Sequence, residues 1–253
     1  MWREFTYWLL QYRRTWRGTI VISVANPLLF LLGIGAGLGH LVDRHAPTEI
    51  AGVSYLAFFA PGMLAAAAMQ TGFIEGSFRV AQAAGFNGSY RAATTTPLGP
   101  TQIMGGHLTF VAFRLATSAA AFVVVMVGFG ATGGWRAVGA LAGALLTGLA
   151  FAGPAAAWAV SVRQGRQINT VFRFVIMPMY LFSGTFFAVT QLPHWLRPVA
   201  YVLPLYHGAE LCRTLSLGTA TLAGTAVHTG VLLALLVAGI AAARVTYRRR
   251  LHP

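Results

Sequence analysis

The sequence contains no lysine and very few acidic residues. All 18 basic residues are arginines, five residues are acidic, and charged residues make up 9% of the 253. A soluble domain carries about 25% charged residues, which keep its surface hydrated. With 57% hydrophobic residues and a mean hydropathy of +0.66, too few charges remain to cover a surface in water. The composition therefore excludes ordinary soluble folds and indicates a protein embedded in lipid.

Several kinds of site are also excluded by what is missing. A P-loop needs the lysine of G-x-x-x-x-G-K-[ST] to reach the β- and γ-phosphates, so any ATP must be bound by another subunit. The single cysteine, Cys212, excludes an intramolecular disulfide. The seven histidines show no metal-ligand spacing such as H-x-x-x-H. We therefore expect no cofactor and no metal site in this chain.

Six apolar runs are each long enough to cross a hydrocarbon core of about 30 Å as a helix. They cover approximately residues 20–39, 55–74, 108–130, 137–162, 168–187 and 222–243. No linker or internal repeat interrupts them, so we expect residues 1–253 to form one all-α membrane domain. Because the first run starts only at residue 20 and is as long as a full span, no cleaved signal peptide is expected.

The arginines are distributed unevenly about these runs. Twelve lie on one side of the expected membrane, and four lie on the other, namely Arg44, Arg136, Arg197 and Arg213. The side with more arginines faces the cytoplasm in membrane proteins, so both termini are expected to be cytoplasmic. A nucleic-acid-binding protein would instead carry a basic face on a soluble fold, and we expect no such partner.

An amphipathic segment at residues 2–17 precedes the first run. Its apolar residues recur at spacings of three and four, which places them on one helical face: Trp2, Phe5, Leu9, Tyr12 and Trp16. Arginines occupy much of the remaining surface. Such a helix lies in the headgroup plane and contacts membrane lipids. The alternative is that these residues are only the first turns of the span that follows.

The connection at residues 75–106, on the arginine-rich side, contains more than a simple turn. A turn at residues 85–88 leads into an expected short helix at residues 89–94, which Pro97 and Pro100 end. A short helix held between two spans suits docking onto a partner protein, and an ordinary solvated loop is the alternative. The candidate docking residues are Gly85, Phe86, Asn87, Gly88, Tyr90, Arg91 and Pro97.

The connection at residues 190–221 lies on the opposite side of the expected membrane. It is too polar and too rich in proline for a span, and too apolar for a free loop. We expect two short helices, at residues 193–203 and 205–215, that re-enter the outer leaflet and cap a pathway. The candidate gate residues are Pro193, Trp195, Pro204, His207, Glu210 and Arg213.

The polar residues near the expected spans allow two readings each. Glu210 and Arg213 are three residues apart, so they form a local ion pair or place Glu210 as a gate or substrate contact. Arg114 and Arg173 lie within snorkelling reach of the arginine-rich side, where they contact lipid phosphate or an anion pathway. His228, in the last run, forms a helix–helix hydrogen bond or belongs to a proton relay.

A specific resemblance lies between residues 182 and 213. This stretch contains Phe-Ser-Gly-Thr-Phe-Phe at 182–187, Leu-Pro-His-Trp-Leu at 192–196 and Leu-Pro-Leu-Tyr-His-Gly-Ala-Glu-Leu-Cys-Arg at 203–213. It resembles the C-terminal signature of ABC-2 type exporter permeases, approximately FSG-x-FFP, LP-x-W and NPL-x-[YH]-x-x-E-x-x-R. Ala188 and Leu203 depart from a frequent Pro and Asn. Over nearly its whole length the chain is similar to the permeases of daunorubicin-type drug exporters and nodulation-factor exporters.

The resemblance implies an interfacial N-terminal helix, six spans and a re-entrant outer hairpin between the fifth and sixth spans. Two permease chains, expected to be identical, would pair in the bacterial inner membrane and sit on two copies of an ATP-binding subunit, which holds the ATP and magnesium. The connection between the second and third spans would be the coupling loop that docks onto that subunit. The fifth span would line the pathway, with Tyr180, Phe182, Phe186 and Phe187 as candidates, which otherwise only pack or face lipid.

These expectations describe the permease subunit of an ATP-driven exporter, which is not itself an enzyme. Its cargo would be an amphipathic drug, a lipid or a lipid-linked glycan. An ion-gradient-driven secondary transporter is the alternative, but it would show inverted repeats and ionisable residues at mid-membrane, whereas Glu75 and Glu210 are expected at span ends. An intramembrane enzyme would need a catalytic constellation, and the sequence offers none with plausible spacing.

Overall fold

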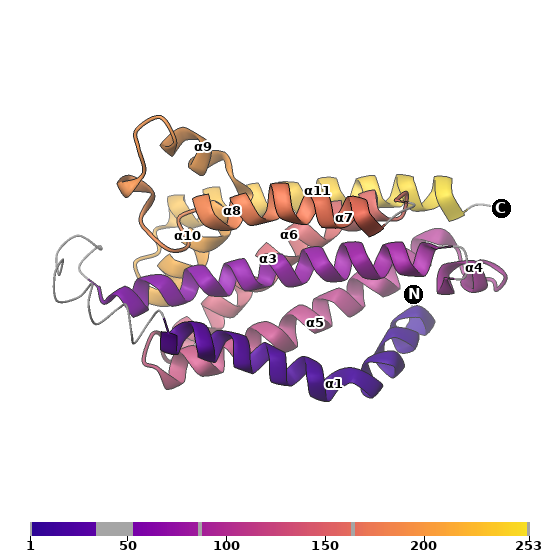
Figure 1. Ribbon diagram of the computed structural model, residues 1–253, viewed down its shortest axis with the longest axis horizontal. Helices are drawn as coiled ribbons and strands as arrows, with labels where there is room; N and C mark the ends of the chain where they lie inside the picture. Colours follow the sequence, from indigo (N-terminus) through magenta and orange to yellow (C-terminus); the bar gives the residue numbers. More distant parts are fainter. Residues whose placement is uncertain (1, 34–52, 86–87, 163–164, 252–253) are drawn as a thin grey trace.

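The computed structural model describes residues 2–33, 53–85, 88–162 and 165–251. Every regular element within these ranges is helical, which confirms the all-α class. The long helices form an elongated bundle, and both chain ends lie at the same end of it as the short helix α4 (Figure 1). Two predicted docking residues, Phe86 and Asn87, lie outside the described residues, as do residues 34–39 of the predicted first span.

The first helix, α1, runs from Trp2 to Phe30 and is bent (Figure 1). It joins the predicted interfacial segment and the start of the predicted first span into one element. Its buried face overlaps only in part with the predicted aromatic face, because Glu4 and Trp8 pack inward beside Tyr12, whereas Trp2 is 74% exposed. The reason is the neighbouring α5, whose Phe110 stacks on the Trp8 ring at 5.8 Å.

The predicted connection at residues 75–106 is shorter in the structure. Helix α3 (Tyr55–Ala84) extends ten residues beyond its predicted end, and α5 (Pro100–Gly128) begins eight residues before its predicted start. Proline at the first helical position suits a helix start, since its missing N–H would have no partner there. The predicted short helix is confirmed as α4 (Ser89–Thr94).

The second half of the chain adds two more long helices, α6 (Trp135–Ala159) and α11 (Leu222–Leu251). Between them, α7 (Gly165–Val171), the π-helical turn η2 (Phe172–Ile176) and α8 (Met177–Phe182) follow one another without a break. The Met177 N–H donates to the Phe172 carbonyl, five residues back. The next residue, Pro178, has no N–H to donate, which favours such an irregular turn at this place.

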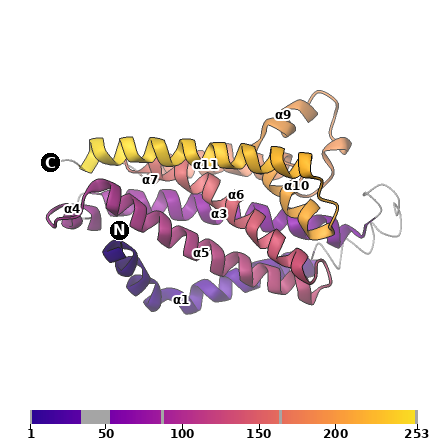
Figure 2. The ribbon, with the colours of Figure 1, turned by 180° about the vertical axis from the view of Figure 1, so that it is seen from behind.

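The segment that follows α8 folds back over one end of the bundle. It contains a short 3₁₀ turn, η3 (Val189–Gln191), then α9 (Arg197–Val202) and α10 (Pro204–Leu217). The first of these helices starts four residues later than predicted, because the Arg197 guanidinium donates to the Leu192 carbonyl (3.0 Å) and holds an irregular loop before it. α9 projects from the bundle, whereas α10 lies against it (Figures 1 and 2).

Four helices among the described residues are long and apolar enough to cross a membrane, and these are α3, α5, α6 and α11. The remaining two predicted spans are not among them. The first continues into residues that the structure does not describe, and the fifth is divided by the π-helical turn. Four candidate spans identify a membrane protein, and the count of six, like the re-entrant hairpin, stays a prediction.

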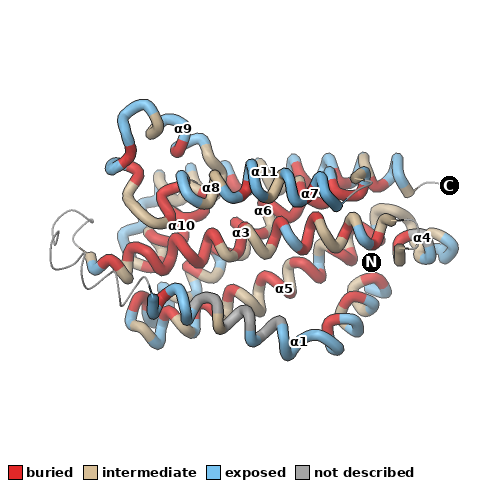
Figure 3. Tube along the Cα trace, viewed as in Figure 1, coloured by how far each residue is buried: buried red, intermediate tan, exposed pale blue. Residues whose placement is uncertain are grey.

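Glycine allows the closest helix packing in the bundle, between α3 and α6. A Cβ at Gly72 would lie 2.1 Å from the carbonyl oxygen of Gly148, and one at Gly76 would lie 2.7 Å from that of Ala152. Helices in lipid associate through such backbone contacts, because burial from water no longer drives them together. Buried residues accordingly concentrate where α3, α6 and α10 meet (Figure 3).

Candidate functional site

The short helix α4 is anchored to the end of the bundle by Tyr90. This side chain is fully buried, and its Oη lies 3.4 Å from the Oη of Tyr247 on α11. Its ring also meets the His107 ring edge-on, with 6.3 Å between centroids. Burial, together with the neighbouring Tyr247, raises the pKa of Tyr90 well above its usual value, so the hydroxyl stays neutral. Tyr90 therefore positions α4 rather than contacting a partner.

Of the other predicted docking residues, Gly85 and Gly88 shape the connection and Pro97 is exposed, while the side chain of Arg91 lies outside what the structure describes. A Cβ at Gly88 would lie 2.0 Å from the Ala83 carbonyl oxygen, so only glycine fits the close return of the chain onto α3. Gly85 ends α3 and donates its N–H to the Gln82 carbonyl at 3.3 Å. Pro97 is exposed, as is Ala92 on α4. The connection thus presents an exposed surface on a fixed frame.

A buried ion cluster lies behind this connection. The Arg114 Nε on α5 lies 3.4 Å from Glu75 Oε1, and the Arg79 Nε lies 2.5 Å from Glu75 Oε2. Arg114 also donates to the Tyr12 hydroxyl at 3.3 Å, and His107 Nε2 lies 3.0 Å from the Glu75 carbonyl oxygen. Through these contacts the cluster ties α1, α3 and α5 together.

This cluster corrects two predictions. Arg114 does not snorkel to lipid, because it is 5% exposed and pairs with a carboxylate 39 residues away in sequence. Glu75 does not follow the end of its helix, as the predicted run 55–74 implied, because α3 continues nine residues past it. The available signal was an arginine inside an apolar run, which needs a buried partner of opposite charge. Glu75 and Arg79 are four residues apart, a helical spacing that indicates only the local half of the cluster.

At the opposite end, which we call the α9 end, Arg213 joins three parts of the fold. Its guanidinium donates to Glu210 Oε1, to the Phe58 carbonyl (3.1 Å) and to the Gly184 carbonyl (2.8 Å). It also lies 3.8 Å above the Phe58 ring. The predicted ion pair with Glu210 is confirmed, and it sits within a buried junction of α10, α3 and the turn after α8.

Glycine makes this junction possible in two places. Gly184 has a φ of +72°, a conformation that side chains with a Cβ rarely adopt. A Cβ at Gly62 would lie 2.9 Å from the Thr185 carbonyl oxygen and 3.1 Å from Arg213 Nη2. The Ser-Gly-Thr part of the sequence signature thus shapes the turn that receives Arg213.

His207, the other titratable gate candidate on α10, pairs with a residue of α11. Its Nδ1 lies 2.9 Å from the Nδ1 of His228, and the Tyr206 ring packs edge-on against both imidazoles. Burial, with His228 nearby, lowers the pKa of His207. This contact realises the predicted helix–helix hydrogen bond of His228. Of the remaining gate candidates, Pro204 begins α10, and Pro193 and Trp195 are exposed.

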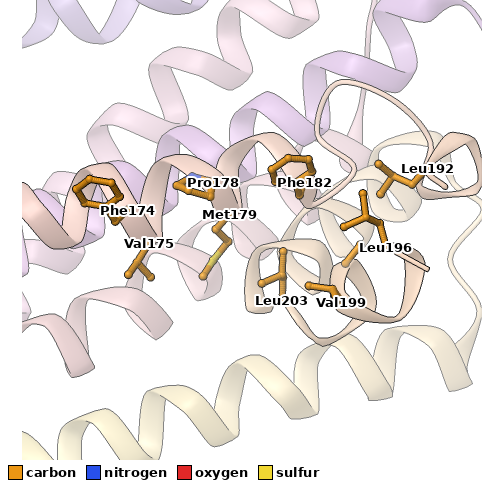
Figure 4. Close-up of a pocket in the computed structure, with 10 residues that line it drawn as sticks. Phe174, Val175, Pro178, Met179, Phe182, Leu192, Leu196, Val199 and Leu203 are labelled. Carbon is orange, nitrogen blue, oxygen red and sulfur yellow. The ribbon is translucent and has the colours of Figure 1, made fainter. Parts of the chain in front are cut away.

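An apolar groove of about 270 Å³ lies between η2–α8 and the segment around α9 (Figure 4). Every lining residue is apolar: Phe174, Val175, Pro178, Met179, Phe182, Leu192, Leu196, Val199, Ala200 and Leu203. Aromatic residues pointed to the α8 side of this groove and the apolar character of residues 190–221 to its α9 side, but no spacing in the sequence joined the two. The groove can receive an apolar chain and offers nothing to a charged group.

Of the four predicted pathway residues, Phe182 lines this groove. Tyr180 points into the bundle, where its hydroxyl donates to the Met63 sulfur at 3.1 Å. Phe186 packs on Phe59 and Tyr180, and Phe187 packs against Val189 and its neighbours. Within the described part of the chain, no three His, Cys, Asp or Glu side chains gather as metal ligands would.

Comparison with known proteins shows which family this chain belongs to. The family model for the ABC-2 type transporter matches residues 1–217. Nodulation protein J of Rhizobium meliloti (strain 1021) is 31% identical, over 97% of this chain and 94% of its own length. Nodulation protein J of Rhizobium leguminosarum bv. trifolii is 33% identical, over 83% of this chain and 81% of its own. No solved structure matches. The chain belongs to the ABC-2 type transporter family.

Proposed function

We propose that this chain is the membrane subunit of an ATP-driven exporter and that α4 is its docking helix for a separate ATP-binding subunit. The observation that carries the proposal is the placement of α4 at the bundle end that holds both termini, with its anchor Tyr90 buried and its Ala92 face exposed. Family membership supports it, since an ABC-2 chain is the membrane component of a transporter. The sequence has no lysine for a P-loop, so the energy source lies in another chain.

In the proposed assembly, two identical permease chains pair in the bacterial inner membrane and rest on two copies of the ATP-binding subunit. ATP and magnesium bind there, and this chain carries out no covalent chemistry. The arginine distribution supports a cytoplasmic α4 end, because twelve of the 18 arginines fall on the side of the expected membrane that holds both termini and α4. The α9 end then faces the outside, where the Arg213 junction holds α10 against the bundle.

The cargo we propose is amphipathic: a drug, a lipid or a lipid-linked glycan. The apolar groove beside α8 supports this, because its all-apolar lining suits the apolar part of such a molecule. Glu75 and Glu210 are each paired with arginine, so neither offers the unpaired carboxylate that an ion-coupled carrier would use. The pairing therefore favours the ATP-driven reading over an ion-gradient mechanism.

Co-expression with the candidate ATP-binding subunit tests the docking helix. We expect the two proteins to purify together and Ala92→Trp to weaken that assembly, because it places a large ring on the exposed face of α4. The matched control is Ala220→Trp, an exposed alanine at the α9 end, which should leave the assembly intact. Equal co-purification of both variants would contradict docking through α4.

A further inference from the structure

We propose that α11 is a lever that couples the docking helix α4 to α10 at the opposite end of the bundle. The proposal rests on the proposed function for the source of the movement, but the coupling itself is a property of this chain. α11 runs along the whole bundle, from the α9 end to α4, in both views (Figures 1 and 2). It is an unbroken helix from Leu222 to Leu251 and contains no proline.

At the α4 end, the lever is attached through Tyr247. Its side chain and that of Tyr90 are both fully buried, with their rings 5.8 Å apart and their hydroxyls 3.4 Å apart. A displacement of α4 away from α11 would strand two buried hydroxyl groups, which is unfavourable. We therefore expect α11 to follow α4. Nearby, Arg248 approaches Thr101 (3.5 Å) and Arg250 donates to the Ser161 carbonyl (3.2 Å).

At the α9 end, α11 is attached to α10 through the His228–His207 contact of 2.9 Å. The two attachments are about 28 Å apart along the helix, at 1.5 Å per residue. His207 lies on the same helix as Arg213, so a shift of α10 would also strain the junction with Phe58 and Gly184. One helix thus touches both ends of the bundle that the sequence singled out.

Between the two attachments lies a point of very close approach. A Cβ at Gly239 would be 2.3 Å from the Cδ of Pro154 on α6, and one at Gly153 would be 3.4 Å from the Gly239 backbone. Such a contact between backbones fixes the position of α11 on α6 at this point, because no side chain of Gly153 or Gly239 lies between the two helices. Gly239 lies between His228 and Tyr247 in sequence, so it can serve as the pivot.

The weak burial of α11 distinguishes it from α3, which also runs the length of the bundle. In its most apolar window, 17% of α11 is buried within the chain, against 72% for α3. Tilting α11 along its contact with α6 therefore disturbs fewer buried side chains than moving α3, which would also break the Gly72–Gly148 contact and the Glu75 ion cluster. α3 is the fixed frame, and α11 is the element free to tilt.

Hydrogen exchange on the permease alone, in lipid nanodiscs, tests the lever without any partner. We expect Tyr247→Ala to raise backbone exchange in α4 and also in α10 around His207, which lies at the far end. His228→Ala should raise exchange in α10 and, in return, in α4. Thr246→Ala is the matched control, because this half-buried neighbour bonds only its own helix turn among the described contacts and should change neither end. Exchange that rises only beside each substitution would overturn the lever.

The assembly with the ATP-binding subunit then tests whether the lever carries the nucleotide signal. A dye attached to a Val202→Cys variant would report at the α9 end, since Val202 is 79% exposed and the native Cys212 is fully buried. ATP binding should change its fluorescence, Tyr247→Ala should reduce that change at least twofold, and Tyr247→Phe should reduce it less. A full response with Tyr247→Ala would overturn the lever, whereas failure of the unmodified chains to assemble would contradict the proposed function alone.

Discussion

Among single residues, Arg213 joins three separate parts of the chain. Because it is buried and serves Glu210 and two backbone carbonyls at once, its loss leaves an acid and two acceptors without their donor. We expect Arg213→Met to lower the free energy of unfolding by about 3 kcal/mol. Arg213→Lys keeps the positive charge but loses the planar guanidinium with its several donors, so it should lower the free energy of unfolding by less. Thermal unfolding in detergent measures both, and an unchanged midpoint for Arg213→Met would contradict the junction.

His207 predicts a pH dependence. Its pKa is lowered by burial, so the unfolded chain binds a proton more readily than the folded one, and stability falls as the pH drops below about 6.5. In the His207–His228 contact one Nδ1 donates its proton and the other accepts it. Protonation of the accepting nitrogen would place two N–H groups opposite each other and break this hydrogen bond, beside the charges of Glu210 and Arg213. The melting midpoint between about pH 5 and pH 8 measures this effect.

His207→Gln should flatten this pH profile, because it removes the titrating group from the contact. The exposed His194 provides the control, and His194→Gln should leave the profile as it is in the unaltered protein. If His207→Gln and the unaltered protein lose stability in parallel on acidification, the titrating group lies elsewhere.

At the scale of elements, the Glu75–Arg114 pair holds α3 to α5. Removing one partner alone strands a buried charge, so Glu75→Gln and Arg114→Met should each destabilise the fold by about 3 kcal/mol. The double variant should lose clearly less than the sum of the two, because neither charge is then left without its partner. Additive losses in this double-mutant cycle would show that the two side chains do not act as a pair.

How far the sequence predicts these elements depends on the range of the contacts that form them. The helix at residues 89–94 and the starts of α3 and α11 follow from local signals, namely turn residues and long apolar runs. The extension of α3 past Glu75 does not, because it depends on Arg114, which the chain brings near only in the folded bundle. The inward packing of Trp8 on α1 was not predicted for the same reason, since it depends on Phe110 of α5.

For the candidate site, too, the sequence predicts the local contacts and not the long-range ones. The signature from Phe182 to Arg213 located the α9 end and the Glu210–Arg213 pair, because both are encoded within a few residues. Apolar residues indicated each wall of the groove, but not that the walls meet. The α9 wall reaches the α8 wall only after the chain turns at Gly184. The attachments of α11 join residues 157 and 21 positions apart, and no spacing rule indicates them.

At the scale of the whole molecule, we propose that an ATP-binding subunit drives the bundle from its α4 end and that the bundle opens at its α9 end. The orientation in the membrane is the premise on which docking depends. It rests on the arginine distribution and on the shared position of α4 and both termini. A direct test needs only one reactive thiol at each end, because the native Cys212 is fully buried.

Labelling of intact cells with a membrane-impermeant maleimide tests this premise most directly. We predict that Ala92→Cys reacts only after the cells are made permeable, and that the ATP-binding subunit then protects it. Ala220→Cys, at the opposite end, should react in intact cells whether or not that subunit is present. Reaction of Ala92→Cys in intact cells would place α4 outside the cytoplasm and contradict the account.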